Sequence, residues 1–151
     1  DATQPKGRRY YWKSEYLPSI EPALCDKVIE HAEHIQSPHS AIILFHIEGA
    51  LNSLDEQHSA VGNRQARFVV NITGSWEGAQ DDAANIAWAR DAWNDLRPFS
   101  TGGTYLNFLT FDEGAERTEA ALRSTLPRLV EIKKKWDPTN FFRTNRNILP
   151  K

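Results

Sequence analysis

The order in which strand-like and helix-like segments alternate is the strongest constraint on how this chain can fold. Apolar spacing and turn residues predict a strand at 9–13, a helix at 20–36, strands at 40–47 and 68–73, a helix ending before Pro98 and a strand at 104–109. This order is the split β-α-β pattern of an α+β fold, in which an antiparallel sheet carries helices on one face in a ferredoxin-like arrangement. A further helix, interrupted at Pro127 and closed by Asp137-Pro138, and an irregular arm from Thr139 to Lys151 follow it.

The second face of such a sheet must be solvated or covered by a partner. Side chains alternate along a strand, so two of the predicted strands divide their residues between a core face and an open face. The predicted core residues are Phe68, Val70, Ile72, Leu106 and Phe108, and the predicted open-face residues are Val69, Asn71, Thr73, Tyr105 and Asn107. A phenol and an amide on one face suit a reaction site. By themselves they are more often plain sheet surface.

Composition narrows the classes of function. The net charge of −2 gives no reason to expect a nucleic acid or an anionic membrane as partner. Cys25 is the only cysteine, which leaves no disulfide or cysteine-based zinc site within the chain. His31 and His34 share a helical face without an evident third ligand, so we expect no metal. The chain carries no apolar segment of membrane-spanning length and its N-terminus does not resemble a signal peptide, which favours a soluble, cytoplasmic protein.

Two stretches of the sequence resemble a known family. Residues 128–148, RLVEIKKKWDPTNFFRTNRNI, resemble the C-terminal signature of the berberine bridge enzyme family, FAD-linked oxidases with the vanillyl-alcohol oxidase architecture. Residues 97–108, RPFSTGGTYLNF, resemble the family stretch that ends in Y-x-N-Y/F. Arg146 departs from the pattern, since the family usually has Gln there. The similarity begins at about Arg9.

The resemblance implies a domain organisation. Residues 1–8 would be a lead-in, residues 9–112 part of a substrate-binding domain, and residues 113–151 the family's C-terminal segment. The FAD-binding domain would be absent from this chain and would be its partner, holding most of the FAD. The absence of methionine, which makes Asp1 an improbable translation start, also favours a piece of a longer protein.

The resemblance also assigns roles to residues. Tyr105 falls on the family tyrosine that lies beside the flavin and helps deprotonate the substrate hydroxyl, and Asn107 is its motif partner. Val69 falls where the berberine bridge enzyme has a catalytic glutamate, and a valine cannot accept a proton. Asn71 and Thr73 would be polar pocket residues. Asn145 would be a contact to the cofactor.

The implied function is oxidation of a small-molecule alcohol or sugar-type hydroxyl by hydride transfer to flavin, with no activity in the isolated chain. A phenol with a pKa of about 10 needs help to act as a base near neutral pH. We expect that help, from a second tyrosine or a cation, to come from outside this chain. The residues alone leave a second hypothesis open: a free-standing α+β module that binds a small ligand or pairs with a second copy of itself.

Overall fold

Three antiparallel strands form the sheet of the computed structural model, which describes residues 4–151. They are β1 (Arg9–Leu17), β2 (Ala41–His46) and β3 (Phe68–Trp76), in the order β1-β3-β2. Both outer strands pair antiparallel with β3, so β1 and β2 run in the same direction. Helix α1 (Pro22–Glu33) connects them. This is the predicted split β-α-β unit, and the predicted α+β fold class is confirmed.

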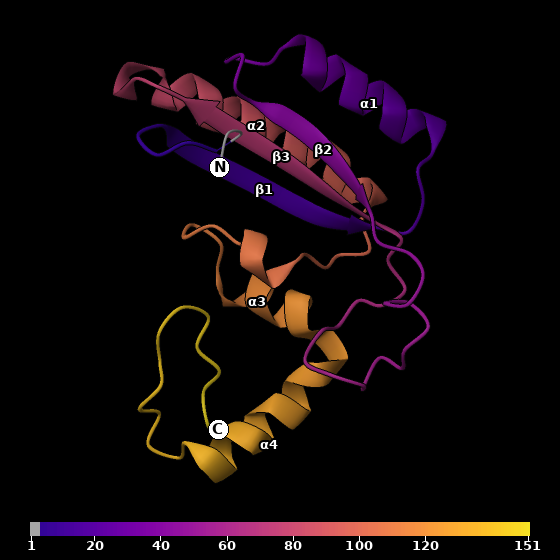
Figure 1. Ribbon diagram of the computed structural model, residues 1–151, viewed down its shortest axis with the longest axis vertical. Coiled ribbons are helices and arrows are strands. Elements are labelled where there is room, and N and C mark those ends of the chain that lie inside the picture. The colour runs from indigo at the N-terminus through magenta and orange to yellow at the C-terminus, as the bar shows by residue number, and fades with distance from the viewer. Residues whose placement is uncertain (1–3) are drawn as a thin grey trace.

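Helices cover one face of this sheet (Figure 1). Helix α2 (Asp82–Leu96) follows a short 3-10 turn (Ala79–Asp81) and ends in another (Arg97–Phe99), where Pro98 stops it as predicted. Its apolar side packs on the helix-facing side chains of β1 and β3. The shared core consists of Leu17, Leu24, Val70, Ile72, Trp88, Ala89, Ala92 and Leu96. A fully buried Leu or Ile side chain stabilises the fold by roughly 1.5–3 kcal/mol, so these contacts hold the helices to the sheet.

The predicted strand at 104–109 is wrong. Residues Leu106–Phe108 form a 3-10 turn, closed by a hydrogen bond from the Phe108 amide to the Tyr105 carbonyl of 2.8 Å. The chain does reach the outer edge of β1, where the Ser14 carbonyl is free of β3. The Thr104 hydroxyl and the Arg117 guanidinium both donate to that carbonyl, at 3.0 Å each. A fourth strand therefore finds its acceptor already taken, and the chain turns away.

The lower half of the molecule contains the rest of the chain (Figure 1). Helix α3 (Ala115–Leu122) and the 3-10 turn Arg123–Thr125 lead into helix α4 (Leu126–Trp136). Pro127 occupies the first turn of α4, where its missing N–H costs nothing, so the predicted interruption at Pro127 is the start of a new helix. The arm after Trp136 has no helix or strand, as expected. Of the predicted lead-in, the first three residues lie outside the described part of the chain.

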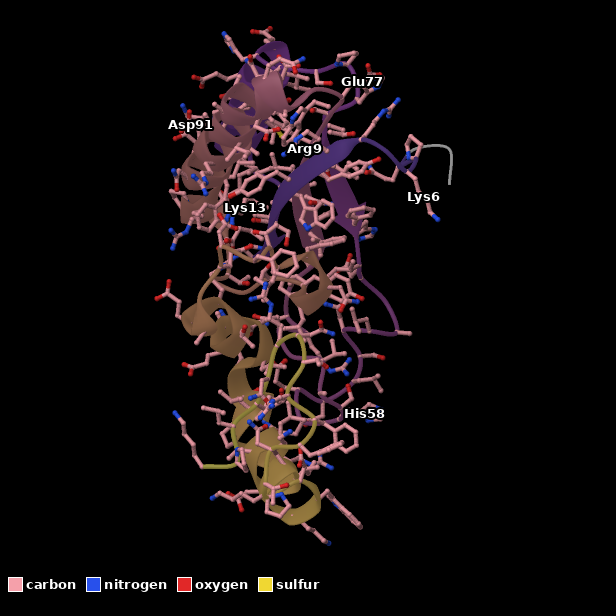
Figure 2. The ribbon with its side chains drawn as sticks, turned by 90° about the vertical axis from the view of Figure 1, so that its left-hand side faces the viewer. Lys6, Arg9, Lys13, His58, Glu77 and Asp91 are labelled. Atoms are coloured by element: carbon pink, nitrogen blue, oxygen red, sulfur yellow. The ribbon has the colours of Figure 1, made fainter. Side chains whose placement is uncertain are left out.

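Buried charges connect the two halves. Lys13 lies on the helix-covered side of β1 (Figure 2), with its ammonium 3.3 Å from the Glu113 carboxylate. Arg117 contacts Glu15 at 2.7 Å and Glu113 at 3.0 Å. All four of these side chains are less than a tenth exposed. Because a buried charge is costly unless paired, this network fixes where α3 sits against β1.

Candidate functional site

The candidate site lies on the face of the sheet that the helices leave open. In Figure 2, Asp91 of α2 and Lys6 of the N-terminal segment lie on opposite sides of the sheet. On the side of Lys6, the register sets Trp12 opposite Thr73, and Ile43 opposite Asn71. A hollow of about 460 Å³ opens over these positions. It is lined by Gln4, Tyr10, Trp12, Ile43, Phe45, Asn71, Thr73, Asn107 and Phe108.

The hollow combines aromatic and aliphatic walls with a few polar groups. Asn71 is only 8% exposed, and its Oδ1 atom has no hydrogen-bond partner among residues 4–151. The buried Nε1 of Trp12 is likewise unpaired within that range. Leaving a buried donor or acceptor unpaired costs roughly 1–3 kcal/mol each. A flat ligand with polar edges would suit this lining better than water alone.

A phenol and an amide meet at one end of the hollow. Asn107 Nδ2 donates to the hydroxyl oxygen of Tyr105 at 2.8 Å. The Tyr105 ring packs edge-on against Phe108 with 5.1 Å between centroids, and Phe108 in turn lies 6.2 Å from Phe45 of β2. The 3-10 turn, and not strand alternation, brings the two polar side chains together. Tyr105 remains 39% exposed and can contact a ligand.

A second tyrosine lies beside this pair. Tyr16 of β1 and Tyr105 both line a smaller hollow of about 240 Å³, which Asn107 also borders. Burial, together with the nearby Tyr105, raises the pKa of Tyr16 to about 12. Tyr16 therefore keeps its proton at any physiological pH. A second phenol thus lies beside Tyr105 within the chain, and the expected help for Tyr105 from outside the chain stays a prediction.

The structure brings together most of the predicted site residues. Asn71, Thr73 and Asn107 line the larger hollow, and Tyr105 borders the smaller one. Val69 is on the predicted face but does not line either hollow: it is 5% exposed, packed with Tyr16 and Ala66 under Phe108.

Asn145 is apart from the other predicted site residues. It borders a different hollow, of about 430 Å³, between the C-terminal arm, α3 and α4, which shares no lining residue with the two hollows at the sheet. The neighbouring Arg146 donates to the Thr110 and Glu113 carbonyls and so fixes the arm there. The predicted role of Asn145 as a cofactor contact stays a prediction.

Several site residues were missed in the sequence. Tyr16 lies beyond the predicted end of the first strand at Lys13, whereas β1 continues to Leu17. Trp12 lies within the predicted strand, but the sequence analysis assigns it to neither face. The alternation of Tyr10, Trp12, Ser14 and Tyr16 was the signal that could have found them. Ile43 and Phe45 lie in a nearly continuous apolar run, which shows no alternation that would mark an open face.

Neither a metal nor a disulfide contributes to the described site. Among residues 4–151, no group of three His, Cys, Asp or Glu side chains is placed to hold a metal ion. Cys25 is exposed and unpaired on α1. No helix in the described range is long and apolar enough to cross a membrane.

Comparison with known proteins shows what this chain resembles. Residues 104–149 match the family described as "Berberine and berberine like". The chain is 26% identical to an FAD-linked oxidoreductase of Dictyostelium discoideum over 99% of its own length and 33% of the relative's. It is also 26% identical to a tetrahydroberberine oxidase of Berberis wilsoniae, over 91% of this chain and 29% of that protein.

Solved structures agree on the fold. A glycopeptide hexose oxidase complexed with teicoplanin matches 95% of this chain and 33% of its own, with a TM-score of 0.82 at 23% identity. The proteins matched in these comparisons are an FAD-linked oxidoreductase and two oxidases. The chain therefore resembles the berberine bridge enzyme-like family, whose model matches residues 104–149. It spans about a third of the length of the relatives it matches.

The residues of the open face fit the cofactor of this family. Trp12, Tyr10 and Phe45 offer flat aromatic surface, and the unpaired Asn71 Oδ1 offers an acceptor for a ring N–H. None of the residues that line the two hollows at the sheet is charged. The two hollows therefore suit the flavin ring system and a neutral substrate. The pyrophosphate of FAD would need charged or hydrogen-bonding residues outside these hollows.

Proposed function

We propose that this chain forms the substrate-side wall of an FAD-dependent oxidoreductase that oxidises an alcohol or sugar-type hydroxyl. Bound FAD supplies the acceptor for the hydride that leaves the substrate C–H, and a second oxidant, such as oxygen, later reoxidises it. Tyr105 accepts the hydroxyl proton, so that the C–OH carbon becomes a carbonyl. The pairing of Tyr105 with Asn107 at the end of the hollow carries this proposal.

The site's chemistry supports a neutral, hydroxyl-bearing substrate. Asn71, Thr73 and Asn107 offer amide and hydroxyl groups that can donate to or accept from hydroxyls. The aromatic side chains beside them suit the apolar face of a sugar ring or a planar alcohol. One protein of the same fold is a glycopeptide hexose oxidase, which is consistent with this substrate class.

The FAD-binding portion of the same protein is the proposed partner. Three aromatic side chains stand out from the lower half of the chain: Trp136, Phe141 and Phe142, 74–77% exposed. Asp137 accepts from the backbone amides of Phe141 and Phe142 at 2.7 and 3.0 Å, which holds the two rings in place. A preformed apolar surface on a chain one-third as long as its relatives suits an interface with the remainder. The isolated chain would then be inactive.

The test is substitution of the proposed base in the full-length protein. Tyr105→Phe removes only the hydroxyl, and we expect the rate of flavin reduction in rapid mixing to fall by roughly 10²–10⁴-fold, the usual contribution of a general base. Protein stability should change little, since Tyr105 is partly exposed.

Tyr11→Phe is the matched control. It also removes one phenol hydroxyl, but Tyr11 bonds to Asp112 at 2.6 Å on the helix-covered side of the sheet. Flavin reduction in this control should stay close to that of the unmodified protein. An unchanged rate in Tyr105→Phe would reject Tyr105 as the base.

The free-standing module is the second candidate, and one observation favours it. The edge strand β2 exposes Ile43, Leu44 and Phe45 to between 36% and 41%. Exposed apolar edge strands pair readily with another strand, which would allow a homodimer. Sedimentation of the full-length protein, with and without FAD, separates the two candidates, because the module requires no cofactor.

A further inference from the structure

The amide of Asn107 contacts Tyr105 in a way that the protein's fold does not require. The 3-10 turn is already closed by its backbone hydrogen bonds, from Phe108 to Tyr105 and from Leu109 to Leu106. Asn107 is exposed and anchors no other segment, since its side chain's hydrogen bond goes to Tyr105 alone among residues 4–151. Its contact with the phenol therefore needs another explanation.

The direction of this hydrogen bond determines what the phenol can do. The amide nitrogen has no lone pair, so Nδ2 donates and the Tyr105 oxygen accepts. The phenol's own hydrogen must then point away from Asn107, towards a third group. Hydrogen bonds donated to an ionised oxygen are roughly twice as strong as those between neutral groups. The contact thus strengthens when Tyr105 loses its proton.

We infer that Asn107 is a positioning residue for Tyr105: its amide fixes the phenol oxygen and steadies it when that oxygen is negative. The inference rests on the proposed function, in which Tyr105 removes the substrate's proton. It gives a physical role to Asn107, which the family resemblance names only as the motif partner of Tyr105.

Among the residues that line the two hollows, Asn107 is the one whose side chain donates to the Tyr105 oxygen. Of the residues that line the smaller hollow, the titratable ones are Tyr16 and Tyr105 themselves. The lining of the larger hollow adds Tyr10, and no cation. Tyr16 is buried beside Tyr105, and burial raises its pKa to about 12, so Tyr16 keeps its proton. A neutral donor is therefore the available stabiliser within residues 4–151.

The test uses this chain by itself. Tyrosine labelled with carbon-13 at the ζ position gives one signal for each of the four tyrosines, and Tyr105→Phe identifies that of Tyr105. In Asn107→Ala we expect the pH midpoint of Tyr105 ionisation to rise by roughly 0.5–1 unit, as for a lost hydrogen bond to a charged group. Asn107→Asp should raise it further, because its carboxylate repels the phenolate.

The control is Asn94→Ala, which removes an exposed amide from α2. It should leave the Tyr105 midpoint unchanged. A midpoint in Asn107→Ala equal to or below that of the unmodified chain would overturn the inference, because a reversed amide that accepts from the phenol gives that result. Circular dichroism of each variant verifies that the fold is kept.

A parallel measurement in the full-length protein distinguishes this inference from the proposed function. The pH profile of flavin reduction in Asn107→Ala should move to higher pH by the same amount as the Tyr105 midpoint. If the midpoint moves but Tyr105→Phe reduces flavin normally, the positioning role stands and the assigned base is wrong. If the midpoint does not move, the positioning role fails whatever the result for Tyr105→Phe.

Discussion

Gly103 illustrates how one residue sets the position of the candidate base. A Cβ atom at this position would overlap the side-chain amide of Asn63. Asn63 cannot move aside easily, since it is 1% exposed and its Nδ2 donates to the carbonyls of Ala120 and Ala121 at 3.2 and 3.0 Å. The close approach of Gly103 to Asn63 therefore positions the two residues that follow it, Thr104 and Tyr105.

We expect Gly103→Ala to lower the free energy of unfolding by about 1–3 kcal/mol, the usual cost of overpacking. Urea denaturation followed by tryptophan fluorescence measures it. Gly114→Ala serves as the matched control, because a Cβ atom there meets nothing within 4 Å, and its stability should be unchanged or slightly higher. Equal stabilities for the two variants would show that Asn63 yields to the methyl group.

At the scale of elements, the sequence pattern predicts the helices and strands whose positions depend on local interactions. The helices at 22–33 and 82–96 and the strands at 41–46 and 68–76 lie within a few residues of their predicted positions, because each has a clear apolar period. Pro127 marks a helix start as predicted. The 104–109 segment also alternates, yet residues 106–108 form a 3-10 turn. At the edge of β1, Thr104 and the more distant Arg117 both bond to the Ser14 carbonyl. No local pattern reveals the contact with Arg117.

In the candidate site, too, some features follow from the local sequence and others depend on contacts between distant segments. The faces of Asn71 and Thr73 followed from alternation, and the pairing of Tyr105 with Asn107 followed from a family motif. Tyr16 was not predicted, since its approach to Tyr105 depends on contacts of the 101–104 loop with the end of β1. Two backbone hydrogen bonds make that contact: the Tyr16 amide donates to Gly103, and Tyr16 accepts from the Thr101 amide.

The acidic pair Asp112 and Glu113, between the 3-10 turn and α3, makes stability depend on pH. Burial opposes ionisation of both carboxyls, but the hydrogen bonds that they accept outweigh burial and hold both pKa values below their ordinary range. The hydrogen bonds to Asp112 come chiefly from Thr110 and Tyr11. The hydrogen bonds to Glu113 come chiefly from Thr110 and Arg117. A lowered pKa in the folded state stabilises the fold above the unfolded-state pKa of about 4, and that contribution is lost as pH falls.

We therefore expect the free energy of unfolding to decline as pH falls below about 5. Chemical denaturation at a series of pH values measures the slope. A variant with Asp112→Asn and Glu113→Gln should be less stable at pH 7 and have a flatter profile. Asp91→Asn, on the exposed side of α2, should keep the original slope. A double variant as steep as the unmodified chain would assign the acid sensitivity to other groups.

At the scale of the whole molecule, apolar side chains remain uncovered at both ends. The upper half exposes part of β2, and the lower half exposes Trp136, Phe141 and Phe142. In a chain that spans about a third of its relatives' length, such surfaces are candidates for contacts with the remainder of the protein. Without that remainder they are available for contacts between copies of the chain.

We expect the isolated chain to self-associate as its concentration rises, because burial of exposed aromatic surface is favourable. Light scattering at several concentrations measures the mass. Replacement of Trp136 and Phe141 by Gln should reduce the association, whereas Phe111→Gln, a fully exposed aromatic outside that surface, should have less effect. A monomer at every concentration would contradict this expectation.

The occupied carbonyl of Ser14 also makes the two edges of the sheet unequal. The outward carbonyls of Ser14 and Tyr16 and the Tyr16 amide are bonded to the 101–104 loop and to Arg117, so another strand cannot pair at these groups. Strand β2 has no such cover among residues 4–151. Any enlargement of the sheet, by insertion, by fusion or by a designed binding peptide, would therefore succeed on the β2 side and fail along this half of β1.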